Sequence, residues 1–113
     1  MPVKLYAMET NRIILEAIAR GLCVSAVYNR LQVILAPHIL YTRHDELFVD
    51  AVTVEREGQP PREIKLGTFK LIGLKDVALA TRAFAPDPIF DPGEDKYAGV
   101  TLFAVAPEAA QAA

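Results

Sequence analysis

The stretch Glu9–Leu74 reads ETNRIILEAIARGLCVSAVYNRLQVILAPHILYTRHDELFVDAVTVEREGQPPREIKLGTFKLIGL. Its first part carries apolar residues at the three-and-four spacing of a helix, and after Gly21 the period changes to the alternation of a strand. Several such strands follow one another, separated by polar turns and by the loop REGQPP at 56–61. One helix followed by short strands predicts an α+β fold.

The predicted helix spans Asn11–Arg20. Ile14 and Ile18 fall on its apolar stripe, together with neighbouring small and branched residues. Thr10 or Asn11 can cap the first turn, and Gly21 provides the left-handed exit that commonly ends a helix. We therefore expect Ile14 and Ile18 to pack on the sheet.

The strands that we expect are short and are joined by turns. Pro37 cannot donate a ladder hydrogen bond, so it ends or kinks the second strand. Four or five such strands, with Gly67 and Gly73 at corners or bulges, fit a small curled sheet or barrel. The expected segments of these strands are 22–28, 31–36, 38–41, 47–55 and 64–71, and 100–105 is expected as one further, last strand.

The chain of 113 residues is expected to form a single domain. Residues 1–8 are expected to lead into the helix, residues 81–96 to form an irregular surface excursion, and residues 106–113 to fray as a tail. The lone Cys23 lies in an apolar run and is expected to be a small buried hydrophobic residue in a reducing compartment.

Charge and hydropathy restrict the setting of the protein. No export signal is expected, and no apolar run reaches about 20 residues, so a cytoplasmic protein without a membrane span is expected. The formal net charge of −2 argues against generic binding of duplex DNA, because that requires a dense cationic surface.

The order of motifs resembles the WYL domain family. Tyr28 ends the first strand, and Pro37, His38 and Leu40 match the second motif. ELFV at 46–49 takes the place of the Trp-Tyr-Leu strand, and GTFKLIGL at 67–74 follows. The resemblance implies an N-terminal helix and a small SH3-like or Sm-like antiparallel β-barrel. It also implies a regulatory module that senses nucleotide or single-stranded nucleic-acid ligands. Because the sequence shows no helix-turn-helix pattern, a stand-alone module is expected.

Basic and aromatic residues are the candidate ligand contacts. Aromatic faces stack on bases, and lysine and arginine contact phosphates. An ordinary solvated surface is the alternative for the charged residues, and a hydrogen-bonded structural histidine is the alternative for His38. Arg30, His44 and Arg62 are further basic candidates. The predicted ligand-binding residues are Tyr28, His38, Tyr41, Arg43, Lys65 and Lys70.

Neither a metal site nor catalysis is predicted. The acidic residues Asp87, Asp91, Glu94 and Asp95 do not have the spacing of a calcium-binding loop. No base adjoins a nucleophile in a recognised motif, and phosphate-binding glycine loops and cofactor signatures are missing. We therefore expect a binding protein without a cofactor.

A protein-interaction or homo-oligomerisation module is the alternative function. Gly67 and Gly73 stand where the family has arginines, and the name-giving aromatic residues are missing, which favours this alternative. The uncharged stretch 100–105 has strand character and could pair with a second copy of the chain. A homodimer is therefore expected, with closure of the protein's own sheet by 100–105 as the alternative.

Overall fold

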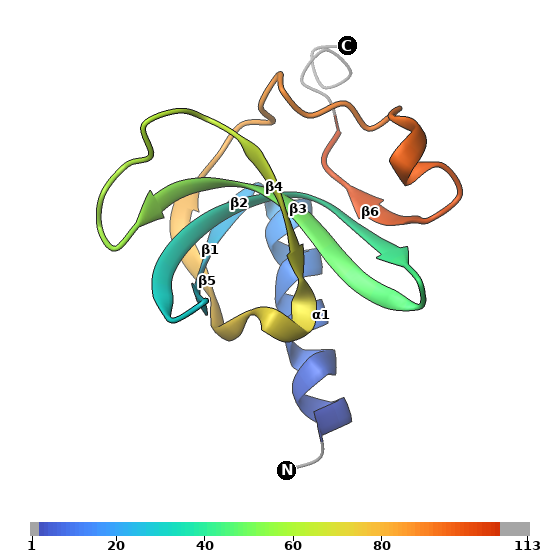
Figure 1. The fold of residues 1–113 in the computed structure, drawn as a ribbon, viewed down its shortest axis with the longest axis horizontal. Coiled ribbons are helices and arrows are strands. Elements are labelled where there is room, and N and C mark those ends of the chain that lie inside the picture. The colour runs from blue at the N-terminus through green and yellow to red at the C-terminus, as the bar shows by residue number, and fades with distance from the viewer. Residues whose placement is uncertain (1–2, 107–113) are drawn as a thin grey trace.

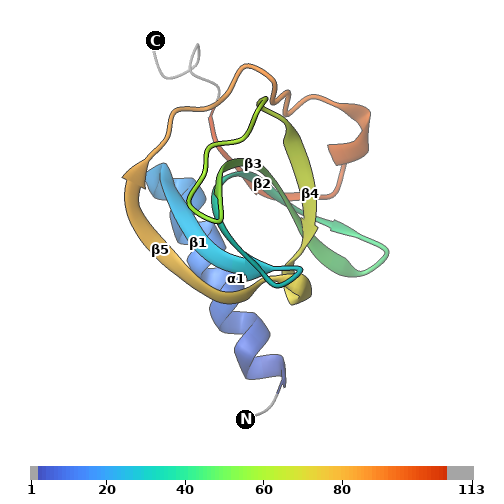
Figure 2. The ribbon, with the colours of Figure 1, turned by 60° about the vertical axis from the view of Figure 1, so that its left-hand side comes forward.

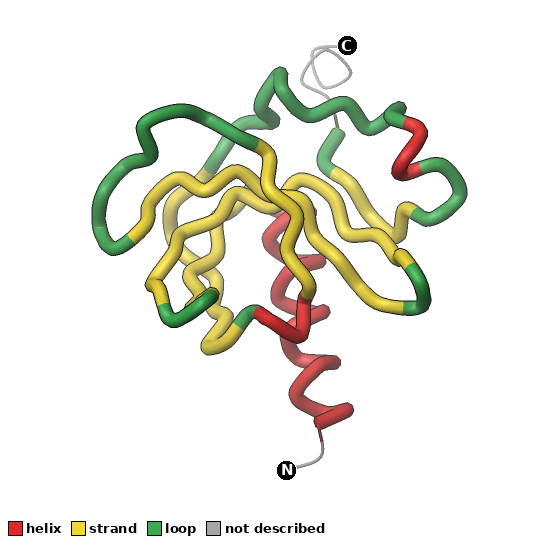
Figure 3. The backbone as a smooth tube through the Cα atoms, in the orientation of Figure 1, coloured by secondary structure: helices red, strands yellow, loops and turns green. Residues whose placement is uncertain are grey.

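The structure is a computed structural model that describes residues 3–106, with side chains described from Glu9 onward. One helix and a six-stranded antiparallel sheet make up an α+β fold (Figures 1 and 3). No helix in this part of the chain is long and apolar enough to cross a membrane. The elements are α1 (Val3–Arg20), β1 (Leu22–Tyr28), β2 (Leu31–Arg43), β3 (Glu46–Arg56), β4 (Leu66–Lys70), η1 (Leu71–Gly73), β5 (Lys75–Ala83), η2 (Asp95–Tyr97) and β6 (Thr101–Ala104).

The helix begins earlier than the sequence pattern predicted. It starts at Val3, so Thr10 and Asn11 lie inside it and do not cap it. Residues 3–10 contain no glycine or proline and include good helix formers such as Leu5 and Ala7, which explains the additional turns. The end at Gly21 is as predicted, with a left-handed φ of 67°.

The predicted packing of the helix is confirmed. Ile14 and Ile18 are 0% and 3% exposed, and they belong to the same buried cluster as Val24 and Val49 of the sheet. Cys23 is buried as expected, in a second cluster with Ala36 and Val52.

The sheet has the order β4-β3-β2-β1-β5, and β6 pairs with the far half of β2. The long strand β2 makes this possible, because Leu31–Leu35 pairs with β1 whereas 39–41 pairs with β6. The sheet curls strongly (Figure 2) but is not closed by hydrogen bonds between β4 and β5. The expected closed barrel is therefore wrong. The 3-10 turn η1 joins these two strands without pairing them.

Two predicted strands are in fact one, and one strand was not predicted. Pro37 does not end β2, which continues to Arg43. It does disturb the strand, because the register with β3 shifts between Pro37 and Ile39. The strand β5 pairs with β1 through two register shifts, and Asp76 in it has a φ of 51°. Because of these irregularities and the exposed edge position, the sequence of β5 lacks the regular alternation of a strand. Since β5 extends to Ala83, the irregular segment that was expected from residue 81 begins only after Ala83.

The two faces of strand β3 point toward different parts of the molecule. Asp50 pairs across the ladder with Thr68, and its neighbours Val49 and Ala51 pair with Phe69 and Gly67. Side chains alternate between the faces of a strand. One face of β3 and β4 therefore carries Phe69 toward the core and a cleft, while the other face carries Asp50 toward the segment that contains η2.

Candidate functional site

A cleft of about 560 Å³ lies between the loop after β3 and the strands β3 and β4. In Figure 2 this loop, in yellow-green, rises between β3 and β4 at the rim of the curled sheet. Thr53, Gly67 and Phe69 line the cleft from the strands, and the prolines at 60–61 line it from the loop. The volume is within the range of about 300–1,000 Å³ that is usual for small-molecule sites.

The base of the loop is anchored by hydrogen bonds. Arg56 and Gln59 exchange backbone hydrogen bonds of 2.8 and 3.0 Å. The Glu57 backbone N–H donates to the carbonyl of Gln32 at 2.8 Å, and the Gln32 N–H donates to the Glu57 carboxylate at 3.1 Å. Pro60 and the following proline further restrict the backbone. The loop therefore has a defined shape at the cleft.

The Phe69 ring forms the floor of the cleft, and the Tyr28 ring packs against it. Phe69 is 8% exposed, and the Tyr28 ring meets it edge to face with centroids 5.0 Å apart. A Cβ atom at Gly67 would lie 3.2 Å from the Phe69 ring, and one at Gly73 would lie 3.2 Å from the Tyr28 ring. Gly67 and Gly73 thus leave space for these rings.

Cations predominate around the cleft. Arg56, Arg62 and Lys65 line it, against the single carboxylate of Glu63. The Lys65 ammonium lies 3.2 Å from the Glu63 carboxylate, and both side chains are at least 70% exposed. In a chain whose net charge is −2, this is a local excess of positive charge.

The structure does not bring the six predicted ligand-binding residues together. Lys65 lines the cleft and Tyr28 lies against its floor. Lys70 forms an ion pair of 3.1 Å with Glu46, which is also the cross-strand partner of Arg43 at the β2–β3 turn. These two basic residues therefore lie toward the other end of the β3–β4 pair from the cleft.

Three further basic candidates are now placed. Arg62 lines the cleft, whereas Arg30 and His44 occupy two-residue turns between strands. Both have positive φ, as do Asn29 and Asp45 beside them, with values from 50° to 67°. Positive φ at both central residues is the mark of a type I′ hairpin turn. Arg30 and His44 therefore belong to hairpin turns and are not among the residues that line the cleft.

His38 is buried and hydrogen-bonded, in agreement with the alternative prediction of a structural histidine. Nδ1 lies 2.8 Å from the Ala36 carbonyl, and Nε2 accepts the Asp87 backbone N–H at 3.0 Å, so we assign the proton to Nδ1. The ring is 5.1 Å from Phe84 and 5.3 Å from Phe90 between centroids. Burial lowers the pKa of His38. The imidazole fastens the 84–90 segment to the kink of β2.

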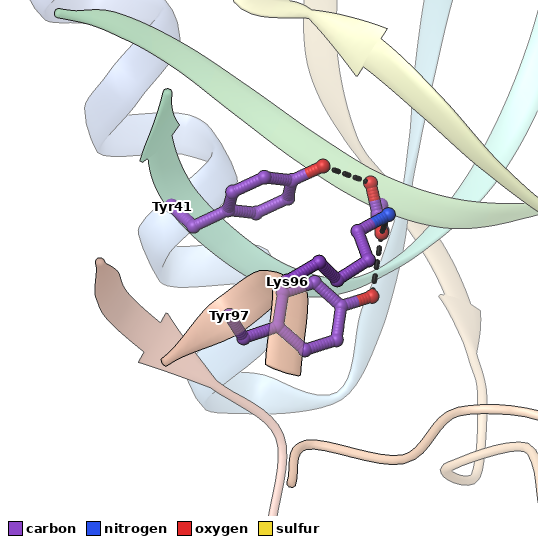
Figure 4. A network of polar contacts seen from close by, with 4 residues as sticks. Tyr41, Lys96 and Tyr97 are labelled. Carbon is purple, nitrogen blue, oxygen red and sulfur yellow. Dashed lines mark hydrogen bonds and ion pairs between the residues drawn. The ribbon is translucent and has the colours of Figure 1, made fainter. Parts of the chain in front are cut away.

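Tyr41 is also buried, and it belongs to a polar cluster around Asp50 (Figure 4). The Tyr41 hydroxyl donates to Oδ1 of Asp50 at 2.7 Å, and the Tyr97 hydroxyl donates to Oδ2 at 2.5 Å. The Lys96 ammonium contacts Oδ2 at 2.9 Å and lies over both phenol rings, 5.6 and 5.2 Å from their centroids. Asp50 itself is 1% exposed. We refer to Tyr41, Asp50, Lys96 and Tyr97 as the Asp50 cluster.

The Asp50 cluster holds a carboxylate in its charged form. Burial alone would raise the pKa of Asp50, but hydrogen bonds from Tyr97, Lys96 and Tyr41 outweigh it, and the pKa lies below its usual value. The pKa of Lys96 is raised because its bond to Asp50 outweighs burial, and burial raises the pKa of Tyr97. Both phenol hydroxyls and the Lys96 ammonium contact the Asp50 carboxylate, and the cluster therefore ties η2 to β2 and β3.

Sequence reasoning missed the Asp50 cluster. Its one signal is a single carboxylate within the apolar run LFVDAV at 47–52. A buried charge in a strand requires partners, but nothing in the sequence identifies Lys96 and Tyr97 as those partners. Among the side chains described, no group of three His, Cys, Asp or Glu residues could hold a metal ion.

Comparison with known proteins adds no relative. No protein-family model, curated protein or solved structure matches the chain. The resemblance to WYL domains therefore remains a prediction.

Proposed function

We propose that this protein is a ligand-binding module of the WYL type, with a regulatory role in the cytoplasm and no catalytic step. Its ligand is an anion of the nucleotide or single-stranded nucleic-acid class. The curled antiparallel sheet and the 3-10 turn between β4 and β5 support a relation to SH3-like folds. The ligand binds in the cleft beside the 56–65 loop.

The observation that carries the proposal is the grouping of Arg56, Arg62 and Lys65 around a cleft with an aromatic floor. Arginine forms paired hydrogen bonds to phosphate oxygens, and such charge-assisted bonds are stronger than neutral ones. Phe69 offers an apolar surface to the rest of the ligand. The net charge of the chain is −2, so generic binding of duplex DNA remains disfavoured.

Fluorescence anisotropy with a short labelled single-stranded oligonucleotide, together with calorimetry with nucleotides, tests the proposal. The double variant Arg62→Glu/Lys65→Glu should lose binding without a change in melting temperature, because Lys65 is exposed and Arg62 lies in a surface loop. Lys70→Glu is the control, since Lys70 is paired with Glu46 away from the cleft. Absence of binding by the parent at low salt, or equal losses in both variants, would reject the site.

Self-association is the second candidate function, and strand β6 favours it. Among the described strands β6 pairs only with β2, and its Leu102 and Phe103 are 54% and 40% exposed. An uncharged edge strand with exposed apolar residues is suited to pairing with a second copy across a two-fold axis. Light scattering decides between a mass near 12.4 kDa and twice that mass. A dimer lost on Leu102→Lys supports this function, and a monomeric parent rejects it.

A further inference from the structure

The aromatic residues are distributed in a way that restricts what can occupy the cleft. Proteins that bind a single strand of nucleic acid stack successive bases on several aromatic side chains along a groove. Phe69 is the one aromatic residue among those that line the cleft, and it is only 8% exposed. Tyr41, Phe48, Phe90 and Tyr97 are buried elsewhere in the described core. The described residues that line the cleft thus offer one aromatic ring to a ligand, not a row of stacking platforms for a strand.

The charges of the cleft are arranged for one anionic group. Three cations surround the cleft, and the carboxylate of Glu63 lies on Lys65 at 3.2 Å. Both partners of this ion pair are largely exposed, at 75% and 70% for their side chains. An exposed ion pair is weak, because water screens it and two long side chains must be ordered. A phosphate can therefore replace the Glu63 carboxylate at small cost.

We infer that the cleft binds one nucleotide-sized anion, and that Glu63 occupies the place of the phosphate on Lys65 in the free protein. The volume of about 560 Å³ fits one small molecule with its phosphate at the cations and its ring toward Phe69. This inference rests on the proposed function. It specifies the ligand as a single nucleotide, and Glu63 as the side chain that competes with the ligand for Lys65. Glu63 weakens binding by the amount needed to displace it.

The chain contains a matched control for Glu63. Glu46 forms an ion pair of similar length, 3.1 Å, with Lys70, away from the cleft. Glu63→Gln and Glu46→Gln each remove one negative charge and each release an exposed lysine. Their effects on the overall charge are equal, so a difference between them reports the local role of Glu63.

Calorimetric titrations at low salt use adenosine 5′-monophosphate, adenosine, inorganic phosphate and a hexamer of deoxyadenosine as probes. The monophosphate should bind with one-to-one stoichiometry, at least about tenfold tighter than adenosine, because the nucleoside lacks the charge-assisted contacts. Inorganic phosphate should compete weakly, since it does not contact Phe69. Glu63→Gln should tighten binding of the monophosphate about two- to fivefold, and Glu46→Gln should leave it within error.

The outcomes separate the inference from the proposed function. A hexamer that binds more than about tenfold tighter than the monophosphate would overturn the inference and retain the proposed function. Equal effects of Glu63→Gln and Glu46→Gln would also overturn the inference, because Glu63 would then act only through overall charge. If none of the four probes binds the parent or Glu63→Gln, both the inference and the proposed function fail.

Discussion

Replacing Asp50 by alanine is expected to lower the free energy of unfolding by about 3–5 kcal/mol. The variant leaves the buried hydroxyls of Tyr41 and Tyr97 without their acceptor. Each unsatisfied buried group costs about 1–3 kcal/mol. The Lys96 side chain is 38% exposed, so its ammonium can turn to water and adds little to the loss. The two phenols therefore account for most of the expected change.

Urea denaturation of Asp50→Ala, evaluated by linear extrapolation, measures this loss. Glu55→Ala is the control, because Glu55 is a carboxylate on the same strand that forms an exposed ion pair of 2.9 Å with Arg82. The control should lose less than about 1 kcal/mol. If Asp50→Ala lost no more than Glu55→Ala, the cluster would not hold η2 on the sheet, and the reasoning would be refuted.

The contribution of the Asp50 carboxylate to stability has a predicted pH dependence. The pKa of Asp50 lies below its ordinary value of 3.8, so the folded protein favours the charged carboxylate. The stability that this group contributes is present above pH 3.8 and is lost as the pH falls through the folded-state pKa. The difference between the parent and Asp50→Asn should therefore be constant near neutral pH and shrink below about pH 4. A difference that shrinks already near neutral pH would contradict a charged Asp50.

Two further predictions follow from buried residues. Burial lowers the pKa of His38 from 6.5, so the unfolded chain binds the proton more readily, and stability should fall as the pH drops below 6.5. His38→Gln should remove this part of the pH dependence in thermal unfolding. An unchanged pH profile would contradict the assignment. Ile18→Ala should cost about 2–4 kcal/mol in urea denaturation, because Ile18 is 3% exposed, whereas Leu15→Ala, 39% exposed on the same helix, should cost much less.

Much of the fold was predictable because local patterns and tertiary packing agree there. The apolar stripe with Ile14 and Ile18 determined the helix face, and alternation after Gly21 determined the strands on either side of the turns at 29–30 and 44–45. The strand β5 was missed because its pairing with β1 shifts register twice. Closure of a barrel could not be decided either, since it depends on whether β4 and β5 meet, and they do not pair.

The candidate site depended on tertiary structure to a greater degree. Sequence reasoning selected Lys65 for its charge and Tyr28 for its ring, and these two lie at the cleft and against its floor. It selected His38 and Tyr41 for the same chemistry, but folding buries both and uses their polar atoms internally. A side chain's type states what it can bind, whereas its availability depends on which distant segment covers it. Tyr97 meets Asp50 across 47 positions, and only the folded chain brings them together.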